Sequence, residues 1–197
     1  TLTLTDPTLA ATVTYRIAPH SASGCTGASL DVVVNVSQVP EAVASDETIC
    51  SGESTSIAIT ELDGIAGTTY TWVVTNVNNV TGAANGSGAT ISQLLTTTAA
   101  GGSVDYEITA HLGSCSQATP TVVTVTVDPT PNVSAAPSTE TICDGTATSI
   151  VLSSPNGVAT GYTWTILTAT NVTGQSPQAA PVAGPIAQTL TLTDPTL

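Results

Sequence analysis

Four cysteines are the residues of this chain with the most specific chemistry. Cys25, Cys50, Cys115 and Cys143 are widely spaced, with no CxxC pair and no histidine-rich cluster beside them. A structural zinc site needs cysteine and histidine ligands at short, regular spacings, whereas scattered cysteines of exported proteins commonly form disulfides. The pattern therefore predicts two disulfide bonds and no metal site.

The two histidines could act as metal ligands or general bases, because imidazole titrates near neutral pH. His20 and His111 each follow a tyrosine by five residues, after Tyr15 and Tyr106. Neither has a second histidine or an acidic residue at ligand spacing. This recurrence favours a side chain at the end of a strand over a catalytic or metal site.

Motifs for nucleophilic catalysis or phosphate binding are absent from the sequence. It contains no GxSxG elbow, no GxGxxG fingerprint and no P-loop, and the glycine-rich stretch 82–88 lacks a following lysine. That stretch is predicted to be a hairpin loop. We therefore predict a protein that is not an enzyme, has no catalytic residues and needs no cofactor.

Acidic pairs are the alternative site for a cation, because Ca²⁺ prefers carboxylate oxygens. Asp46-Glu47 and residues 61–64 bring such groups close in sequence. The D-x-D-x-D-G spacing of a dedicated calcium loop is missing. Solvated charges that discourage aggregation of strand edges are favoured, and calcium at a loop or domain joint stays the alternative.

Aromatic side chains are few, because phenylalanine is absent and the chain has two tryptophans and four tyrosines. They recur at equivalent positions of a repeated motif. Each tryptophan stands in a Tyr-Thr-Trp triplet. An exposed tryptophan could stack on a sugar, but recurrence at equivalent strand positions favours filling of a core. The predicted core aromatics are Tyr15, Tyr70, Trp72, Tyr106, Tyr162 and Trp164.

The elements that must position these residues are β-strands. Threonine makes up about a fifth of the chain, and with valine and isoleucine it favours a pleated, half-buried surface. Residues 30–36 and 121–127 alternate with the period of two that is typical of strands. No stretch has a strong helical pattern. The sequence therefore predicts an all-β protein with a thin, aliphatic core.

The charge balance excludes two classes of partner. Arg16 is the only basic side chain other than histidine, against fourteen acids, and the formal net charge is −13. Nucleic-acid phosphates and anionic membranes both require lysine or arginine surfaces. No apolar run approaches the ~20 residues of a membrane span and no signal peptide is visible. We expect no nucleic-acid binding, no membrane insertion and an interior segment of a larger exported protein.

A perfect repeat joins the two ends of the sequence, because residues 1–9 recur identically as residues 189–197, an offset of 188. Repeats at a fixed period are typical of tandem architectures. We therefore expect further copies of this repeat in the same polypeptide.

A second, diverged repeat of ~93 residues lies inside that period. The matched pairs are 48–52 with 141–145, 70–72 with 162–164, 80–82 with 172–174, and 104–108 with 13–17. One unit contains about seven short strands, which predicts a tandem immunoglobulin-like antiparallel β-sandwich.

The phase of this repeat divides the chain into three parts. Residues 1–40 are the C-terminal part of one repeat, 41–131 a complete repeat, and 132–197 the N-terminal part of the next. This phase pairs Cys50 with Cys115 inside the complete repeat. Cys143 and Cys25 are then partners across the repeat cut. A Cys25–Cys143 bond within one chain would instead indicate a closed second domain.

The ordered motifs T-I-C-x-G, Y-T-W, V-T-G, V-x-Y-x-I and D-P-x-P resemble the PKD-like, immunoglobulin-like repeats of very large surface proteins of the Bacteroidota. The resemblance covers essentially the whole chain. Such proteins are typically exported by the type IX secretion system and include gliding and adhesion filaments. The W-D-F-G-D-G run of ordinary PKD domains is missing, since Val73-Val74 follow Trp72, so properties that rest on it do not transfer.

The expected function is structural: a disulfide-stapled spacer in an extracellular cell-surface filament or adhesin stalk, assembled as a homo-oligomer. The alternative is a carbohydrate-binding accessory module of a secreted enzyme. That alternative predicts an exposed aromatic patch or a calcium loop in one repeat that is missing from its neighbour.

Overall fold

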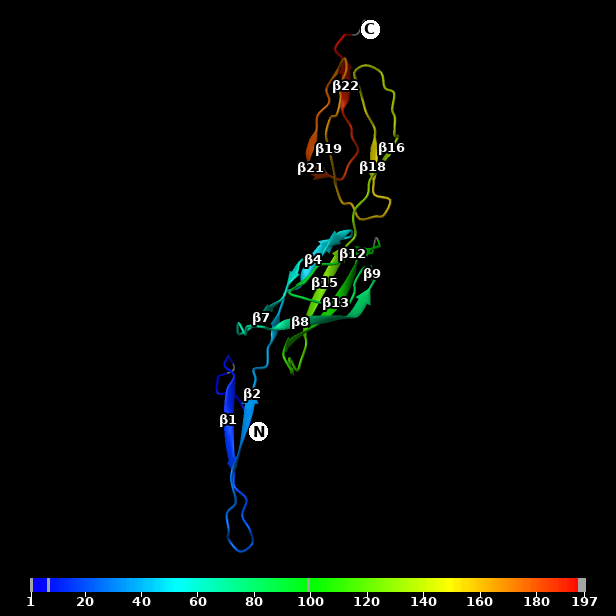
Figure 1. Cartoon of the computed structure of the whole chain (residues 1–197). Helices are drawn as coiled ribbons and strands as arrows, with labels where there is room; N and C mark the ends of the chain where they lie inside the picture. Colours follow the sequence, from blue (N-terminus) through cyan, green and yellow to red (C-terminus); the bar gives the residue numbers. More distant parts are fainter. Residues whose placement is uncertain (1, 7, 99, 195–197) are drawn as a thin grey trace. The chain divides into compact units, whose positions relative to one another are not determined.

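The structure is a computed structural model that describes residues 2–6, 8–98 and 100–194, and every regular element among them is a β-strand. The predicted all-β, immunoglobulin-like sandwich class is therefore confirmed. No helix of the described residues is long and apolar enough to cross a membrane. The chain divides into two compact units, unit 1 (1–128) and unit 2 (129–197), whose strands are labelled in Figure 1. The three-part division at 40/41 and 131/132 stays a prediction.

The main sheet of unit 1 is built on three long antiparallel strands. In order of pairing it contains β10 (Gly86–Ser87), β8 (Thr69–Asn78), β13 (Gly102–Leu112), β15 (Thr121–Asp128) and β4 (Glu47–Cys50), with β14 (Cys115–Ser116) on the end of β13. Only β4 is parallel to its neighbour, β15. The chain enters the sandwich beside Thr121, whose hydroxyl donates to the carbonyl of Ala42 at 2.6 Å. It leaves at Asp128, the opposite end of β15.

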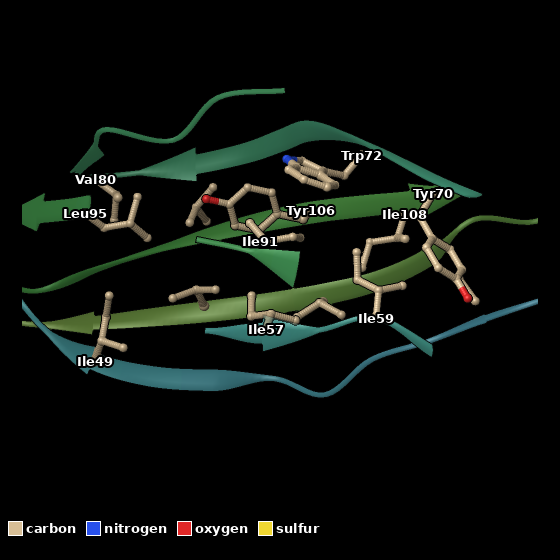
Figure 2. Close-up of a cluster of buried hydrophobic side chains, with 14 of the residues drawn as sticks. Ile49, Ile57, Ile59, Tyr70, Trp72, Val80, Ile91, Leu95, Tyr106 and Ile108 are labelled. Carbon is tan, nitrogen blue, oxygen red and sulfur yellow. The ribbon is translucent and has the colours of Figure 1, made fainter. Parts of the chain in front are cut away.

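Short strands form a second layer over one face of the main sheet. They are β5 (Glu53–Ser54), β12 (Leu94–Thr97) and β9 (Val80–Thr81), the pair β6 (Ile57–Ala58) and β11 (Thr90–Ile91), and the pair β3 (Ala42–Val43) and β7 (Thr60–Glu61). Figure 2 shows apolar side chains of both layers meeting between them. This layer closes the sandwich.

The core of unit 1 follows from strict alternation along the central strands. Val104, Tyr106, Ile108 and Ala110 of β13 are fully buried, whereas the residues between them are half-buried. Successive side chains of a strand point to opposite faces, so a period of two places one face in the core. Tyr70 and Trp72 are buried in the same cluster. The core is aliphatic apart from these three aromatic side chains.

Thr55 is the one buried polar side chain in the described core, and it is 1% exposed. Its hydroxyl donates to the carbonyl of Ile91 and accepts from the amide of Gln93, both at 2.9 Å. We expect Thr55→Val to lower the free energy of unfolding by about 2–3 kcal/mol, because it leaves two buried backbone groups unpaired. Urea denaturation measures this loss. Thr55→Ser keeps the hydroxyl and should recover most of it; equal losses in both variants would contradict the hydrogen-bond explanation.

Residues 11–36 form a hairpin of β1 (Ala11–Ile17) and β2 (Leu30–Val36). Tyr15 faces Val32 in this hairpin. The same repeat positions pair Tyr106 with Val123 in the main sheet. Tyr15 is 47% exposed, so its predicted place in a core is wrong. The reason is that the hairpin does not contribute to the packed core of unit 1.

Unit 2 repeats the first part of the sandwich with shorter strands. These are β16 (Ser134–Ala136), β17 (Thr146–Ala147), β18 (Val151–Ser153), β19 (Tyr162–Trp164), β20 (Val172–Thr173), β21 (Gln178–Val182) and β22 (Thr189–Leu192). The sheet β17-β22-β20 reproduces β5-β12-β9, and the pair β16-β18 reproduces β3-β7. Among the described residues of unit 2, no strand corresponds to β13 or β15. Tyr162 and Trp164 are consequently only half-buried.

Candidate functional site

The four cysteine thiols are free in the structure. Cys50 pairs with Asp128 at one end of β15, whereas Cys115 pairs with Leu112 beyond the other end. The eight residues of β15 rise about 3.3 Å each, so its ends lie roughly 23 Å apart. A disulfide requires Cα atoms within about 7 Å of each other. The predicted Cys50–Cys115 bond is therefore wrong.

The pairing of Cys143 with Cys25 across the repeat cut stays a prediction, and the geometry of unit 1 argues against it. Cys143 occupies the repeat position of Cys50, and Cys25 that of Cys115. In a completed second sandwich these positions would again lie at opposite ends. Both cysteines are exposed in the chain as it stands.

Both histidines lie at strand ends and bind neighbouring hydroxyl groups. The ring of His111 is 2.9 Å from the hydroxyl of Thr71 through Nε2 and 2.9 Å from that of Ser116 through Nδ1. His20 makes the corresponding contact to Thr26 at 3.1 Å. These bonds tie the tip of each hairpin.

The acidic pair Asp46-Glu47 caps backbone amides. Asp46 accepts from the amide of Thr124 at 2.8 Å, and Glu47 accepts from the amide of Ser56 at 3.0 and 3.2 Å. Within the part of the chain that the structure describes, no group of three or more histidine, cysteine or acidic residues could hold a metal ion. Calcium binding stays an alternative suggested by the sequence, and no cluster of ligand residues in the described part of the chain supports it.

A three-residue arrangement around each tryptophan, here called the Trp–Gln clamp, recurs in both units. In unit 1 it consists of Trp72, Ala84 and Gln93. The indole Nε1 donates to the carbonyl of Ala84 at 3.1 Å, and Gln93 donates to the same oxygen at 2.6 Å. The amide of Ala84 returns a bond to Gln93 Oε1 at 2.9 Å. The clamp thus fixes the ring against the core.

The clamp of unit 2 contains Trp164, Ser176 and Gln188 with the same bonds. Trp164 Nε1 donates to the carbonyl of Ser176 at 3.1 Å, and Gln188 donates to that oxygen at 2.6 Å. The amide of Ser176 donates to Gln188 Oε1 at 3.1 Å. Neither glutamine was predicted as a site residue from the sequence, although I-x-Q-x-L recurs at 91–95 and 186–190.

Tyr106 distinguishes the two clamps. Its hydroxyl donates to Gln93 Oε1 at 2.8 Å. This oxygen therefore accepts two hydrogen bonds, one from Tyr106 and one from the amide of Ala84. Tyr106 comes from β13, a strand without a counterpart among residues 129–194 of unit 2. Among the described residues, Gln188 Oε1 therefore accepts a hydrogen bond from the amide of Ser176, whereas its equivalent, Gln93 Oε1, accepts a second one from a tyrosine.

Burial raises the pKa of Tyr106 to about 12, because the phenolate would lose its hydration. An unfolded tyrosine has a pKa of about 10, so between pH 10 and 12 the folded state retains a proton that the unfolded state releases. We expect this residue's contribution to stability to be constant below pH 10. Above pH 10 it should fall by about 1.4 kcal/mol per pH unit.

Urea midpoints between pH 9 and 12 measure this effect, and the absence of lysine keeps other titrations few. Tyr106→Phe should remove the slope attributed to Tyr106. Burial, followed by the charge of Glu61, also raises the pKa of Tyr70, which should leave a residual slope in that variant. An unchanged pH profile in Tyr106→Phe would contradict the assignment.

The most distinctive surface of the chain is the open face of unit 2, made of Tyr162, Trp164, Ile166, Ile186 and Gln188. Two adjoining clefts of about 270 and 290 Å³ meet there, and Trp164 and Ile186 line both. Its lining is mainly apolar, and it also contains the side-chain amides of Asn132, Gln175 and the clamp residue Gln188. The open face therefore combines an apolar surface with a few side-chain amides.

Comparison with known protein families matches residues 2–40 and 47–131 to the PKD-like domain. A search of curated proteins found no match. PKD-like domains are generally extracellular structural or adhesion modules, and they are generally non-catalytic. The matched segments cover well over half of the sequence. The chain therefore belongs to the PKD-like domain family.

Proposed function

We propose that this chain is a repeat segment of a large extracellular surface protein, in which the sandwiches are spacers of a filament or adhesin stalk. One observation carries the proposal: residues 1–9 recur as residues 189–197, so the sequence returns to its starting phase after two ~93-residue repeats. The partners in this proposal are further copies of the repeat in the same polypeptide, associated as a homo-oligomeric filament. The bacterial surface proteins that the motifs resemble favour export by type IX secretion.

The topology of unit 1 supports a load-bearing role without a disulfide. The chain enters beside Thr121 and leaves at Asp128, and β4 runs parallel to β15 with four paired residues. Tension applied at 41 and 128 therefore pulls these neighbouring strands in opposite directions along their length. Their hydrogen bonds are loaded together rather than one after another. In this proposal the hydrogen bonds between β4 and β15 bear the tension, in place of the disulfide bonds that were predicted from the sequence.

Labelling of intact cells with an antibody against unit 1, followed by electron microscopy, tests the proposal. We expect surface filaments with a regular two-domain axial repeat of 188 residues. A soluble, non-filamentous parent protein that carries a separate catalytic domain would overturn the proposal.

A carbohydrate-binding accessory module is the second candidate, and the half-buried Trp164 in the clefts of unit 2 is the observation that favours it. Its equivalent Trp72 is buried. The missing counterparts of β13 and β15 explain this difference without a ligand. Titration with oligosaccharides, read by Trp164 fluorescence in a Trp72→Phe background, should give no saturable change; a saturable change would favour this second function.

A further inference from the structure

The segment by which the chain enters unit 1, residues 41–46, runs beside the first half of β15. The backbone ladder of β4 with β15 covers the second half, Val125–Asp128. The pair of β3 with β7 holds the entering segment to the second layer of the sandwich. Its attachment to the first half of β15 therefore depends on side chains.

Gln117 and Thr121 bind both backbone groups of Ala42. Gln117 Oε1 accepts from the amide of Ala42 at 3.0 Å, and also from the amide of Ala110 in β13 at 3.1 Å. The Thr121 hydroxyl donates to the carbonyl of Ala42 at 2.6 Å and accepts from Gln117 Nε2 at 3.0 Å. Ala42 is buried, and the two side chains that bind it are half-buried. Hydrogen bonds are electrostatically stronger in such partly desolvated surroundings than in water.

Asp46 fills the gap between this contact and β4. Its carboxylate accepts from the amide of Thr124, in the middle of β15, at 2.8 Å. Hydrogen bonds to an ionised carboxylate are stronger than those between neutral groups. Contacts to the entering segment thus continue along β15 from Thr121 to Asp128. Gln117, Thr121 and Asp46 are here called the entry latch.

The entry latch lies where tension on the chain arrives first. Tension applied at residue 41 reaches Ala42 before any residue of β4, and the latch joins Ala42 to the strand that leads to the exit at Asp128. While the latch holds, its bonds and the ladder of β4 are loaded together. Once the latch opens, the four paired residues of β4 remain as the main attachment to β15.

The other repeat type of the chain, represented by its two end segments, has a glycine at the position of Gln117. Gly27 donates its amide to the carbonyl of Pro19 at 2.9 Å, and Gln117 makes the equivalent bond to Ala110 at 2.9 Å. The backbone is therefore alike at the two positions. Glycine has no side chain that could reach an entering segment.

The remaining two latch positions are also changed in that repeat type. Leu30 has the register position of Thr121, so a leucine replaces the hydroxyl group. Thr139 follows Asp46 by the repeat offset of 93, so a neutral threonine replaces the carboxylate. The glutamates that come next in the two segments each accept from a serine amide at 3.0 Å, which supports this alignment. All three latch side chains are thus replaced in the other repeat type.

We propose that the entry latch sets the lifetime of the complete repeat under tension, and that the repeat type without a latch opens first. Forced unfolding is governed by the rate of unfolding. That rate is lowered by interactions that are lost in the transition state. The latch is such an interaction, because it is lost as soon as the entering segment separates from β15.

This inference rests on the proposed function as a spacer under tension, and it gives the two repeat types different parts in that function. An opened repeat of ~93 residues lengthens the chain by up to about 300 Å. Unequal repeats therefore let the surface protein extend in steps, while the latched repeats stay folded.

Constant-force unfolding of the full chain in optical tweezers tests the latch. With the four native cysteines replaced by serine, Val39→Cys and Val133→Cys provide the attachment points, because both valines are exposed. Tension then passes only through residues 39–133. We expect Gln117→Ala with Thr121→Val to shorten the lifetime of folded unit 1 about tenfold, the factor that corresponds to the loss of one or two hydrogen bonds.

Thr121→Ser is the matched control, because it keeps the hydroxyl group of the latch. Its lifetime under force should stay within about twofold of that of the unmodified chain. A tenfold loss in this control would contradict the assignment of the effect to the hydroxyl.

Thr55→Val separates the latch from general stability. The buried bonds of Thr55 join residues of the second layer, and they are not loaded when the entering segment separates from β15. Thr55→Val should therefore lower the urea midpoint more than the latch variant does, yet shorten the lifetime under force less. Lifetimes that follow the urea midpoints across all variants would overturn the proposal.

A tandem fusion tests the difference between the two repeat types. Residues 1–188 followed by a second full chain place residues 132–188 directly before residues 1–40, which completes the other repeat type. With attachment at Val133 of the first copy and Val39 of the second, we expect its lifetime to be about tenfold shorter than that of unit 1 at the same force. An equal or longer lifetime would overturn the order of opening.

Transfer of latch residues into this repeat is the complementary test. Leu30→Thr in the second copy with Thr139→Asp in the first restores the hydroxyl and the carboxylate, and it should lengthen the lifetime of the completed repeat. An unchanged lifetime would show that other differences between the repeats determine the order of opening.

These outcomes separate the inference from the function on which it rests. A latch that sets the lifetime under force, in a parent protein that forms no surface filaments, would retain the inference and remove the proposed function. Surface filaments built from repeats whose lifetimes do not depend on the latch would retain the function and remove the inference.

Discussion

Replacement of Tyr106 by alanine is expected to lower the free energy of unfolding of unit 1 by about 3–5 kcal/mol, the range for loss of a large buried aromatic side chain. Tyr106 is fully buried at the centre of β13, and its hydroxyl donates to Gln93 at 2.8 Å. The substitution creates a cavity and also removes the hydrogen bond to the clamp. The core has few large side chains nearby that could move in to refill the space.

The matched control is Tyr15→Ala, the same residue type at the same position of the repeat. Tyr15 is 47% exposed in the hairpin, so its loss should change the stability of unit 1 by less than about 0.5 kcal/mol at micromolar protein concentration. Urea denaturation of a Trp164→Phe background, followed by the fluorescence of Trp72, measures both variants. Similar losses in the two would show that repeat position alone, without burial, sets the contribution.

The repeat architecture could be predicted from the sequence because its evidence is local and recurrent. The triplet Tyr-Thr-Trp at 70–72 and 162–164, and the alternating run 121–127, each show their pattern within a few residues. Alternation with a period of two is a direct consequence of strand geometry. The all-β sandwich class and the burial pattern of β13 and β15 follow from such patterns.

The cysteine pairing could not be predicted because it depends on the position along a strand, not only on membership of a strand. An even count of cysteines and a two-sheet fold are satisfied equally well by pairs at the same end or at opposite ends. Cys50 lies at the exit end of β15 and Cys115 near its entry end. Only the register of β4 against β15 separates these possibilities, and no short motif in the sequence encodes it.

Gln93 and Thr55, two polar residues beside the core, could not be predicted for a different reason. Gln93 and Thr55 are 38 residues apart, and their bond joins the side-chain hydroxyl of one to the backbone amide of the other. Neither residue type indicates a core position. The repeat did contain the signal, since Thr-Ser-Ile at 55–57 recurs at 148–150 and the glutamines recur with it. A search for polar residues conserved between the two internal repeats would have found the pair.

Gly82→Ala is the second substitution with a large expected effect. Gly82 ends the Val-Thr-Gly turn after β9, with φ of 98°, in the region that L side chains rarely adopt. A Cβ atom built there overlaps the backbone carbonyl oxygen of Leu94, which belongs to the neighbouring strand β12. Gly174 in unit 2 has the same conformation, with φ of 95°, and the same overlap with Thr189. The repeat thus uses glycine where two backbones approach closely.

Two costs add at this position. Alanine in the left-handed region costs about 1–2 kcal/mol. Displacing a paired strand to relieve the overlap adds about 1–3 kcal/mol, because a backbone carbonyl cannot rotate away as a flexible side chain can. We expect Gly82→Ala to lower the free energy of unfolding by about 2–5 kcal/mol, measured by the midpoint of urea denaturation.

Gly52→Ala separates the two costs. Gly52 has φ of 93° but no atom within 4 Å of an added Cβ, so it has the conformational cost without the overlap. Its loss should be about 1–2 kcal/mol. The difference between the two losses in the free energy of unfolding then measures the cost of the overlap between β9 and β12. If the two losses were equal, the strands would be able to separate without cost, and the close approach at Gly82 would not contribute to the stability of the sandwich.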